Sequence, residues 1–323
     1  MRELIIGNND AGQRLDRFVI KAVPALSPSL AQKYIRTKRI KLNGRRSGGA
    51  ERLGAGDTVQ LYINDEFFPS QGGGGSYMSI MTPGLDIIYE DSNILLADKR
   101  AGVLCHPGDG ELAADADTLI ARVLAHLYQS GQWSPEDEAT FAPALCNRLD
   151  RNTSGIVIAA KNAESLRIIN EKIRTREIDK HYLAAVHGTP DPPSGTLENY
   201  IFKDSAKNKV FVSDRRARGA RWAATEYNVV ASAHGLALLE CKLVTGRTHQ
   251  IRAQLAHIGH PLLGDEKYGR GALNSQYGEK SQALRAHKLA FAFESDAGSL
   301  NYLRGAEFKA PTPDFGKKYF GLD

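Results

Sequence analysis

One aspartate of this chain stands between two arginines at the entry to an apolar run. Asp150 lies between Arg148 and Arg151, and the polar residues 152–155 follow. Neighbouring guanidinium groups favour the ionised form of a carboxylate, and an ionised carboxylate can act as a nucleophile or as a general base. The same pattern on a surface can also be a plain ion pair beside a strand. The chemical interpretation therefore depends on the rest of the chain.

The apolar run at residues 155–160 predicts the element that positions this carboxylate. The run is short, is rich in β-branched residues and ends at Lys161 and Asn162, which is typical of a buried strand. The polar residues before it then form a loop. This loop would hold Asp150 at the entry to the strand.

Residues 147–155, Asn-Arg-Leu-Asp-Arg-Asn-Thr-Ser-Gly, resemble the catalytic motif of the RluA-type pseudouridine synthases. Asn147 stands where that family usually has histidine. The resemblance implies an enzyme that converts uridine to pseudouridine in structured RNA, with Asp150 as the catalytic residue and no cofactor or metal. It also implies that four neighbours contact the substrate: Arg148, Leu149, Arg151 and Thr153.

Two later segments continue the family pattern. Residues 180–188 predict a strand, and the family places a tyrosine at the position of Tyr182, against the catalytic carboxylate. A buried aromatic side chain with a bonded hydroxyl is the structural alternative. Residues 245–252 resemble a third motif whose last arginine lies beside the aspartate, which maps to Arg252, with Arg247 as the second candidate. The same motif adds His249 and Gln250 to the expected substrate contacts.

Two other histidine-containing motifs are open to a chemical interpretation. His106, in the segment 99–107 where Arg100 replaces a family proline, could be a base, but we favour a structural or RNA-facing role. Residues 257–260 spell the His-Ile-Gly-His signature of class I aminoacyl-tRNA synthetases. That signature begins a helix near a nucleotide-binding loop, whereas here it closes a predicted helix late in the chain. We therefore set the synthetase hypothesis aside.

Two alternatives of other classes remain at this point. A non-catalytic RNA-binding or ribosome-assembly protein could keep the same fold, but it would have no need to retain Asp150, Tyr182 and Arg252 together. A hydrolase that uses a carboxylate pair would need a second acidic residue near Asp150, and nothing in the sequence provides one.

The charge of the chain is concentrated at its N-terminal end. The 323 residues carry a net charge of +5, yet residues 1–63 alone hold 12 Lys and Arg against 5 Asp and Glu. A basic module attached to a nearly neutral body indicates a polyanionic partner such as nucleic acid. The length also favours two domains.

The basic module predicts two helices and a small β ribbon. The first helix follows Leu15, and Ser27-Pro28 start the second. Asn43-Gly44 predict a hairpin turn before a strand at 58–63. This pattern resembles the S-four-like RNA-binding domain named after a ribosomal small-subunit protein, although Lys38-Arg39 replace its usual glycine. Its expected RNA contacts are Arg14, Arg17, Lys33, Arg36, Lys38, Arg39, Lys41 and Arg45. A solvated basic face without a ligand is the alternative.

The domain boundaries follow from composition. We expect the RNA-binding domain at 1–65, a flexible linker at 66–84 around Gly72–Gly75, and the catalytic domain at 85–323. The body is predicted to be an α+β domain with a mixed, largely antiparallel sheet and a central cleft. Strands are expected at 85–89, 94–98, 180–188, 224–232, 236–244 and, last, 289–293; helices at 119–127, 163–174 and from 250 to about 258. Residues 189–220, with Arg215, Arg216 and Arg218, are expected to form a crossing loop that touches RNA or is simply solvated.

The cellular setting follows from the cysteines and the N-terminus. Three well-separated cysteines match no metal spacing, and their odd number fits reduced thiols in the cytosol. No long apolar stretch indicates secretion or a membrane span. We expect a cytoplasmic monomer whose partner is structured RNA, ribosomal by resemblance, with transfer RNA as the alternative.

Overall fold

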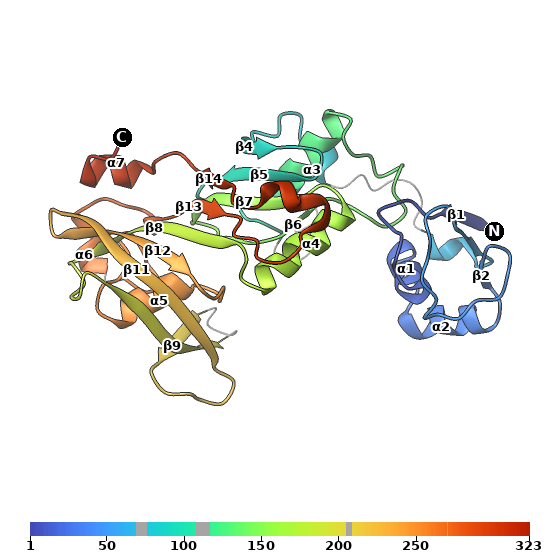
Figure 1. The fold of residues 1–323 in the computed structure, drawn as a ribbon, viewed down its shortest axis with the longest axis horizontal. Coiled ribbons are helices and arrows are strands. Elements are labelled where there is room, and N and C mark those ends of the chain that lie inside the picture. The colour runs from blue at the N-terminus through green and yellow to red at the C-terminus, as the bar shows by residue number, and fades with distance from the viewer. Residues whose placement is uncertain (69–75, 108–116, 205–208, 270) are drawn as a thin grey trace.

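The computed structural model describes residues 1–68, 76–107, 117–204, 209–269 and 271–323 (Figure 1). The glycine-rich run predicted as a linker, Gly72–Gly75, lies outside the described residues. In the ribbon view, residues 1–68, called the N-terminal module below, lie beside a larger body.

The N-terminal module is a three-stranded antiparallel sheet with two helices. Its elements are β1 (Arg2–Ile5), α1 (Leu15–Ala22), α2 (Pro28–Arg36), β2 (Ile40–Leu42) and β3 (Thr58–Leu61), with the strand order β1-β3-β2. Ser27 caps α2 by accepting a hydrogen bond from the Leu30 N–H at 3.3 Å, as its sequence predicts. The predicted turn is present, with positive φ at Asn43 and Gly44.

The module has a hydrophobic core of its own. Phe18, Val19 and Leu61 are fully buried there. Phe67 and Phe68 also pack against this core, so the module continues beyond the predicted boundary at residue 65. Lys38, which stands where the resemblance implies a glycine, has φ +65°, so the chain adopts a left-handed turn there with a lysine.

The body is built on one large sheet. Its strands are β4 (Asp86–Glu90), β5 (Ile94–Lys99), β6 (Ala144–Leu145), β7 (Ser154–Ala160), β8 (Asp179–His187), β9 (Ser194–Asp204), β10 (Lys209–Ser213), β11 (Arg221–Ala233), β12 (Leu236–Leu243), β13 (Leu284–Ala290) and β14 (Glu307–Lys309). The order is β10-β9-β11-β12-β8-β13-β7-β5-β4, with β14 beside β13 and β6 beside β7. Among these described strands β13 and β7 pair in parallel and the other pairs are antiparallel. The predicted α+β class with a mixed, largely antiparallel sheet is confirmed.

Helices cover both faces of the sheet around β7. Around β7 these are α3 (Leu119–Gln129) and α4 (Ala163–Arg174). The body also contains α5 (Gln250–His257), α6 (Gly271–Ser275), α7 (Asp314–Phe320) and the short 3-10 helices η2 (Ser76–Ser79) and η4 (Gly298–Leu303), whereas η1 (Asp65–Phe67) belongs to the N-terminal module. Val123 of α3 shares a core with Val157, whereas Ile169 of α4 shares another with Ile156 and Ile158. Because both faces of β7 are covered, its sequence is continuously apolar. No helix among the described residues has the length and apolarity needed to cross a bilayer.

Two predictions about the body were wrong. The expected loop at 189–220 contains β9 and β10, whose alternation was hidden by the prolines before them and the arginines after them. The last strand was expected at 289–293, but β13 already begins at Leu284 and β14 follows it. Arg285 interrupts the apolar pattern there and is buried through an ion pair with Asp98 at 2.6 Å.

The N-terminal module contacts the body directly. Asp10, which is fully buried, accepts a hydrogen bond from the Thr140 N–H at 3.3 Å, and Gln13 donates to the Thr140 hydroxyl at 3.2 Å. Within the predicted linker, the Tyr77 ring packs edge-on against Trp133 at 5.4 Å. This end of the segment 66–84 is therefore docked on the body rather than free.

Candidate active site

A cleft of about 1530 Å³ lies in the body and gathers segments that are far apart in the sequence. Residues 104–107, 146–153, 242–252 and Tyr182 line it. All ten predicted catalytic and substrate-binding residues line this one cleft: Arg148, Leu149, Asp150, Arg151, Thr153, Tyr182, Arg247, His249, Gln250 and Arg252. The expected central cleft is present.

The loop that carries Asp150 is fastened to the sheet and to a buried thiol. Asn147 Oδ1 accepts a hydrogen bond from the Ile158 N–H of β7 at 2.8 Å. The Leu149 N–H donates to Cys105 Sγ at 3.3 Å. The Thr153 N–H donates to the Asp150 carbonyl at 3.0 Å and closes the turn. The side-chain amide of Asn147 thus has a structural role, and the departure from the family histidine leaves the loop anchored.

Asp150 forms an ion pair with Arg252, as the resemblance implied. Arg252 Nη1 lies 2.8 Å from Asp150 Oδ2, and the Asp150 side chain keeps 26% of its surface exposed to the cleft. The other two guanidinium nitrogens bind Asp265, with Nε 2.7 Å from Oδ2 and Nη2 3.0 Å from Oδ1. Asp265 is fully buried. The guanidinium is therefore fixed from behind and presents one donor to Asp150.

The ionisation of Arg252 follows from these contacts. Burial by itself disfavours its charge, but the bonds to Asp265 and then to Asp150 outweigh burial and raise the pKa of Arg252 above its usual value. In the same way, Arg252 overcomes the burial of Asp265 and holds the pKa of that carboxyl low. A permanent cation thus faces Asp150.

Tyr182 lies in the buried wall of the cleft. Its side chain is 6% exposed, and no hydrogen bond of its hydroxyl occurs among the described residues. Burial, and after it the charge of Asp150, raise the pKa of Tyr182 above its ordinary range, so the phenol stays neutral. The site thus combines a carboxylate, a fixed cation and an apolar ring with a neutral hydroxyl.

Known proteins were compared with this chain, whose site combines Asp150, Arg252 and Tyr182. The family model described as RNA pseudouridylate synthase matches residues 93–257, which include the loop 146–153, Tyr182 and Arg252. The chain belongs to this family. It is therefore an isomerase that converts uridine to pseudouridine in RNA.

Relatives of the chain agree along most of its length. An uncharacterized RNA pseudouridine synthase of Chlorobaculum parvum is 31% identical, over 93% of this chain and 91% of the relative. The ribosomal large subunit pseudouridine synthase D of Xanthomonas campestris is 29% identical, over 90% of this chain and 85% of that protein. The fold resembles that of human RNA pseudouridylate synthase domain containing 1, with a TM-score of 0.56 at 20% identity, covering 73% of this chain and 86% of that one.

His249 is positioned in this synthase by Tyr268. His249 Nδ1 lies 2.8 Å from the Tyr268 hydroxyl, which also accepts the Val210 N–H at 2.9 Å. His249 Nε2 lies 3.8 Å from Asp150 Oδ2. Burial lowers the pKa of His249, with Arg252 acting in the same direction and Asp150 opposing. A neutral imidazole can offer Nε2–H towards the carboxylate or towards a bound base.

Three of the side chains that were predicted to contact the substrate are buried within the protein. Leu149 and Thr153 are buried, and Thr153 Oγ1 accepts a hydrogen bond from Gln282 at 3.3 Å. Gln250 is also buried, and its amide donates to the Ala224 carbonyl at 2.9 Å. These side chains hold the cleft in shape. In contrast, Arg148, Arg151 and Arg247 are exposed at its rim.

Lys99 is a buried lysine beside the loop of Asp150, and its contacts were not predicted from the sequence. It is 1% exposed, and its ammonium donates to three carbonyls: Arg100 at 3.1 Å, Val103 at 2.8 Å and Arg151 at 2.9 Å. Burial lowers its pKa to about 8. Lys99 thus ties the loop at 100–103 to the loop that carries Asp150. Its place after an apolar strand was visible in the sequence, but its burial was not.

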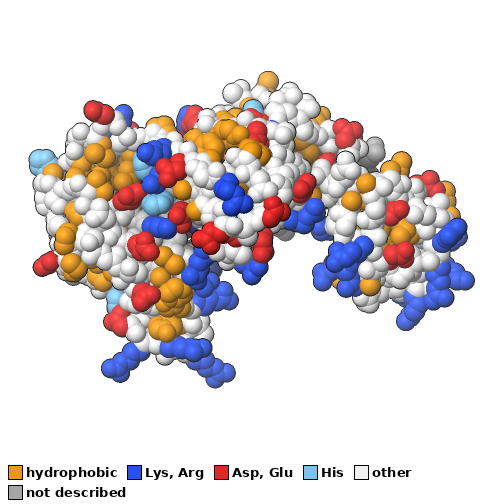
Figure 2. All heavy atoms as spheres, viewed as in Figure 1, with side chains coloured by type: hydrophobic (Ala, Val, Ile, Leu, Met, Phe, Trp, Pro, Cys, Tyr) orange, Lys and Arg blue, Asp and Glu red, His pale blue; other side chains and the backbone are white. Residues whose placement is uncertain are grey.

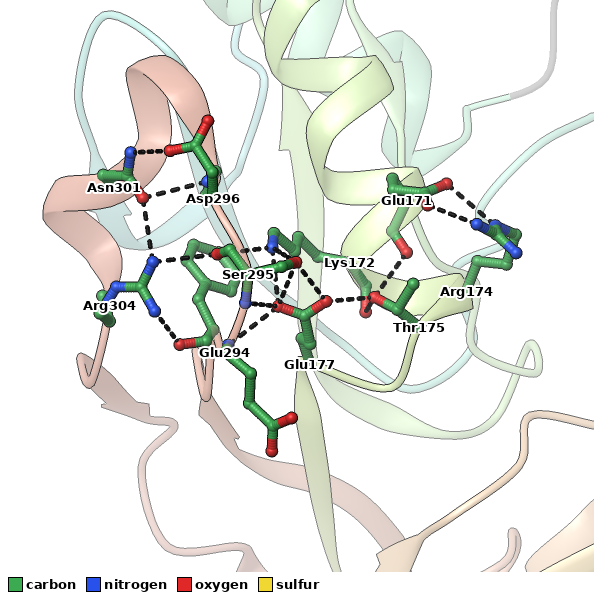
Figure 3. A network of polar contacts seen from close by, with 12 residues as sticks. Glu171, Lys172, Arg174, Thr175, Glu177, Glu294, Ser295, Asp296, Asn301 and Arg304 are labelled. Atoms are coloured by element: carbon green, nitrogen blue, oxygen red, sulfur yellow. Dashed lines mark hydrogen bonds and ion pairs between the residues drawn. The ribbon is translucent and has the colours of Figure 1, made fainter.

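A polar network fastens another part of the cleft wall (Figure 3). Lys172 of α4 lies 2.7 Å from Glu177, which also accepts the Ser295 N–H at 3.0 Å. These bonds, that of Lys172 first, hold the pKa of Glu177 well below its usual value. The turn at 174–178 between α4 and β8 contributes Arg174 and Arg176 to the cleft.

The remaining candidates from the sequence are His106, the string at 257–260 and the basic residues of the N-terminal module. His106 lines the cleft, and burial lowers its pKa. The string at 257–260 closes α5, as expected. The predicted RNA contacts of the N-terminal module lie outside the cleft. All of them are exposed except Lys41, which is half-buried, and Arg14 pairs with Asp16 at 2.6 Å. In the described part of the chain, no three or more His, Cys, Asp or Glu side chains cluster as for a metal ion.

Proposed function

We propose that this chain converts specific uridines of large-subunit ribosomal RNA to pseudouridine, with Asp150 as its catalytic residue. The observation that carries the proposal is the contact between Asp150 and Arg252, 2.8 Å long, in a cleft that also holds Tyr182. The ribosomal substrate is supported by relatives from Xanthomonas campestris and Nitrosomonas europaea, which are named as ribosomal large subunit synthases.

The reaction requires a bond exchange on one nucleotide. The bond between ribose C1′ and uracil N1 breaks, the ring turns, and C5 bonds to C1′. The proton on C5 must then leave, and N1 takes up one. Substrate and product are isomers, so the balance needs no oxidant, reductant or nucleotide.

Asp150 has two chemical routes in this exchange. As a nucleophile it attacks the sugar or the base; as a base it removes a proton from the sugar. Both routes need the ionised carboxylate, which Arg252 stabilises and orients. Tyr182 would stack on the uracil or assist removal of the C5 proton.

The target base must leave its stack before it reaches Asp150. An enzyme of this kind extrudes the nucleotide into its pocket and compensates for the lost stacking with its own side chains. Arg148 lies next to Asp150 and is exposed at the cleft rim, so we assign it to fill the space that the base vacates.

The N-terminal module would hold the RNA, and the body would carry the chemistry. Lys33 and Arg36 of α2 are exposed, and Arg14, Arg36 and Arg46 line a separate hollow of about 600 Å³. Such contacts would supply salt-dependent affinity to phosphates. We place the enzyme in the cytoplasm with this RNA, as a monomer.

The test is the variant Asp150→Asn on a large-subunit ribosomal RNA transcript that carries tritium at uracil C5. We expect tritium release to be abolished while RNA binding survives, because only the charge of the cleft changes. Asp137→Asn, which removes an exposed carboxylate elsewhere, is the matched control. Turnover of Asp150→Asn near that of the wild type would reject Asp150 as the catalyst.

The choice of RNA is tested separately. Pseudouridines mapped in total RNA from cells with and without the gene should differ in large-subunit ribosomal RNA. A difference confined to transfer RNA would contradict the ribosomal assignment without affecting the role of Asp150.

A further inference from the structure

Two phenylalanines stand exposed and face each other across the β9–β10 hairpin. Phe202 and Phe211 are direct partners in the antiparallel register. Phe202 is 45% exposed and Phe211 46% exposed. Cross-strand aromatic pairs normally stabilise a sheet by being buried against a neighbour, whereas these two rings keep much of their surface open to solvent.

The strand register places two more aromatic residues on the same face. Tyr200 lies two residues before Phe202 on β9 and is paired with Trp222 of β11. Side chains alternate along a strand, so the opposite face carries Ile201, Val210 and Ala223, which pack against Ala253 of α5. Tyr200, Phe202, Phe211 and Trp222 thus form one outward surface, called the aromatic platform below.

Basic residues surround the aromatic platform. Arg215, Arg216 and Arg218 follow β10 in the chain, are exposed and form no ion pair within the described residues. Lys203 and Arg221 are also exposed, on the other face of the strands, where they pair with Val210 and Ile201. A Cβ atom added at Gly219 would lie 3.7 Å from the Phe202 ring, so the chain after Arg218 passes beside the platform. Figure 2 shows hydrophobic side chains over this end of the sheet, with Lys and Arg side chains around its tip.

The aromatic platform begins where the catalytic cleft ends. The guanidinium of Arg176 lies over the Trp222 ring at 5.3 Å, and Arg247 Nε donates to the Trp222 carbonyl at 3.3 Å. Both arginines line the cleft. Glu226, another cleft residue, lies five residues along β11 from Arg221, which pairs with Ile201 next to Phe202. Five residues correspond to roughly 17 Å at about 3.3 Å per residue.

This combination suits one kind of ligand. Exposed rings beside unpaired arginines match single-stranded RNA, whose bases stack on aromatic side chains while its phosphates meet the cations. A protein partner would gain from the apolar rings but would have to cover the surrounding positive charge.

We propose that the aromatic platform binds unpaired nucleotides next to the target uridine, by stacking on Phe202 and Phe211, and so guides the strand into the cleft. This inference rests on the proposed function, because it takes an RNA substrate for granted. It adds that the substrate is recognised through a single-stranded segment beside the modified base, at a site separate from the N-terminal module.

The test uses the full chain and a short single-stranded RNA that contains 2-aminopurine, whose fluorescence falls when the base stacks. The double variant Phe202→Leu/Phe211→Leu keeps apolar, strand-compatible side chains and removes both rings. We expect it to bind this RNA about tenfold more weakly than the wild type and to lose the fluorescence quenching. Val230→Ala, an exposed apolar residue elsewhere on β11, is the matched control and should leave both readings unchanged.

Two further measurements complete the test. A duplex RNA of the same length should bind the double variant as it binds the wild type, since its bases are not free to stack. On the tritiated ribosomal transcript, KM should rise with little change in kcat. Unchanged quenching and affinity, or an equal weakening of duplex binding, would overturn the inference.

Failure of the inference can be told from failure of the proposed function. If the wild type releases no tritium from ribosomal RNA, the proposed function fails, whereas the quenching experiment still reports on the aromatic platform. If the wild type releases tritium and the double variant matches it in KM and quenching, only the inference fails. Circular dichroism of the leucine variant checks its fold, and Phe211→Tyr, which keeps a ring, should retain quenching.

Discussion

Asp265 holds Arg252 through two hydrogen bonds of 2.7 and 3.0 Å, and this leaves one guanidinium nitrogen for Asp150. A free arginine side chain has many rotamers, and each would present a different donor. The buried carboxylate selects one of them. The electrostatic environment of Asp150 therefore depends on Asp265, which does not itself line the cleft.

Asp265→Asn should lower kcat by about 100-fold while the KM for RNA changes little, because a small displacement of a catalytic group has effects of that size. Single-turnover tritium release and RNA binding measure the two quantities. Glu90→Gln removes a carboxylate paired with Lys161 away from the cleft and controls for reduced stability. If Asp265→Asn lowers activity only in proportion to its unfolded fraction, Asp265 has no positioning role.

Lys99 should make activity fall as the pH rises through about 8, because the ammonium that joins the two loops then loses its proton. The stability of the fold should instead increase as the pH rises. The pKa of Lys99 in the folded chain, about 8, lies below the ordinary 10.5, so between these pH values the unfolded chain binds the proton and the folded chain does not. The free energy of unfolding contributed by this group therefore increases with pH across that window.

The variant Lys99→Met isolates this effect. Its activity should be low and its pH profile above 8 flat, and the contribution of this group to the pH dependence of the unfolding free energy should disappear. Urea unfolding and tritium release at a series of pH values measure both. A wild-type profile that keeps its shape in Lys99→Met would assign the titration to another group.

Gly155→Ala should destabilise the protein by about 3 kcal/mol or more, because strain and overpacking combine. Gly155 has φ +111°, and an added Cβ would lie 2.1 Å from the Ala286 carbonyl oxygen of β13. Gly305→Ala is the matched control: its φ is +77° but it faces open space, so about 1–2 kcal/mol is expected. Equal destabilisation in urea unfolding would show that the close approach of β7 and β13 is not the cause.

The charge reversal Lys33→Glu/Arg36→Glu should weaken RNA binding uniformly across sequences. It should also reduce the slope of log affinity against log salt by about 1 for each RNA phosphate that the module no longer neutralises. The same change at Lys317 and Lys318 on α7 removes equal charge away from the module and serves as the control. An unchanged salt slope would argue against an RNA role for the N-terminal module.

Local patterns in the chain predicted much of the architecture. The apolar run at 155–160, the cap at Ser27-Pro28 and the periodicity of 163–174 depend on neighbouring residues alone, and the corresponding elements form where expected. Local patterns failed where a strand contains a polar residue, as in β13 at Arg285. Arg285 can be buried in this strand because Asp98, which is distant in sequence, supplies the opposite charge.

The sequence by itself determined the family, through the ordered motifs around Asp150, Tyr182 and Arg252, and it determined that the basic charge lies at the N-terminal end. Only the tertiary structure decided that Asp265 fixes Arg252, that Lys99 is buried beneath the loop of Asp150, and that Phe202 and Phe211 meet on an exposed face. These relationships join residues that strand pairing and burial bring together, and pairing and burial are properties of the folded chain that no short segment encodes.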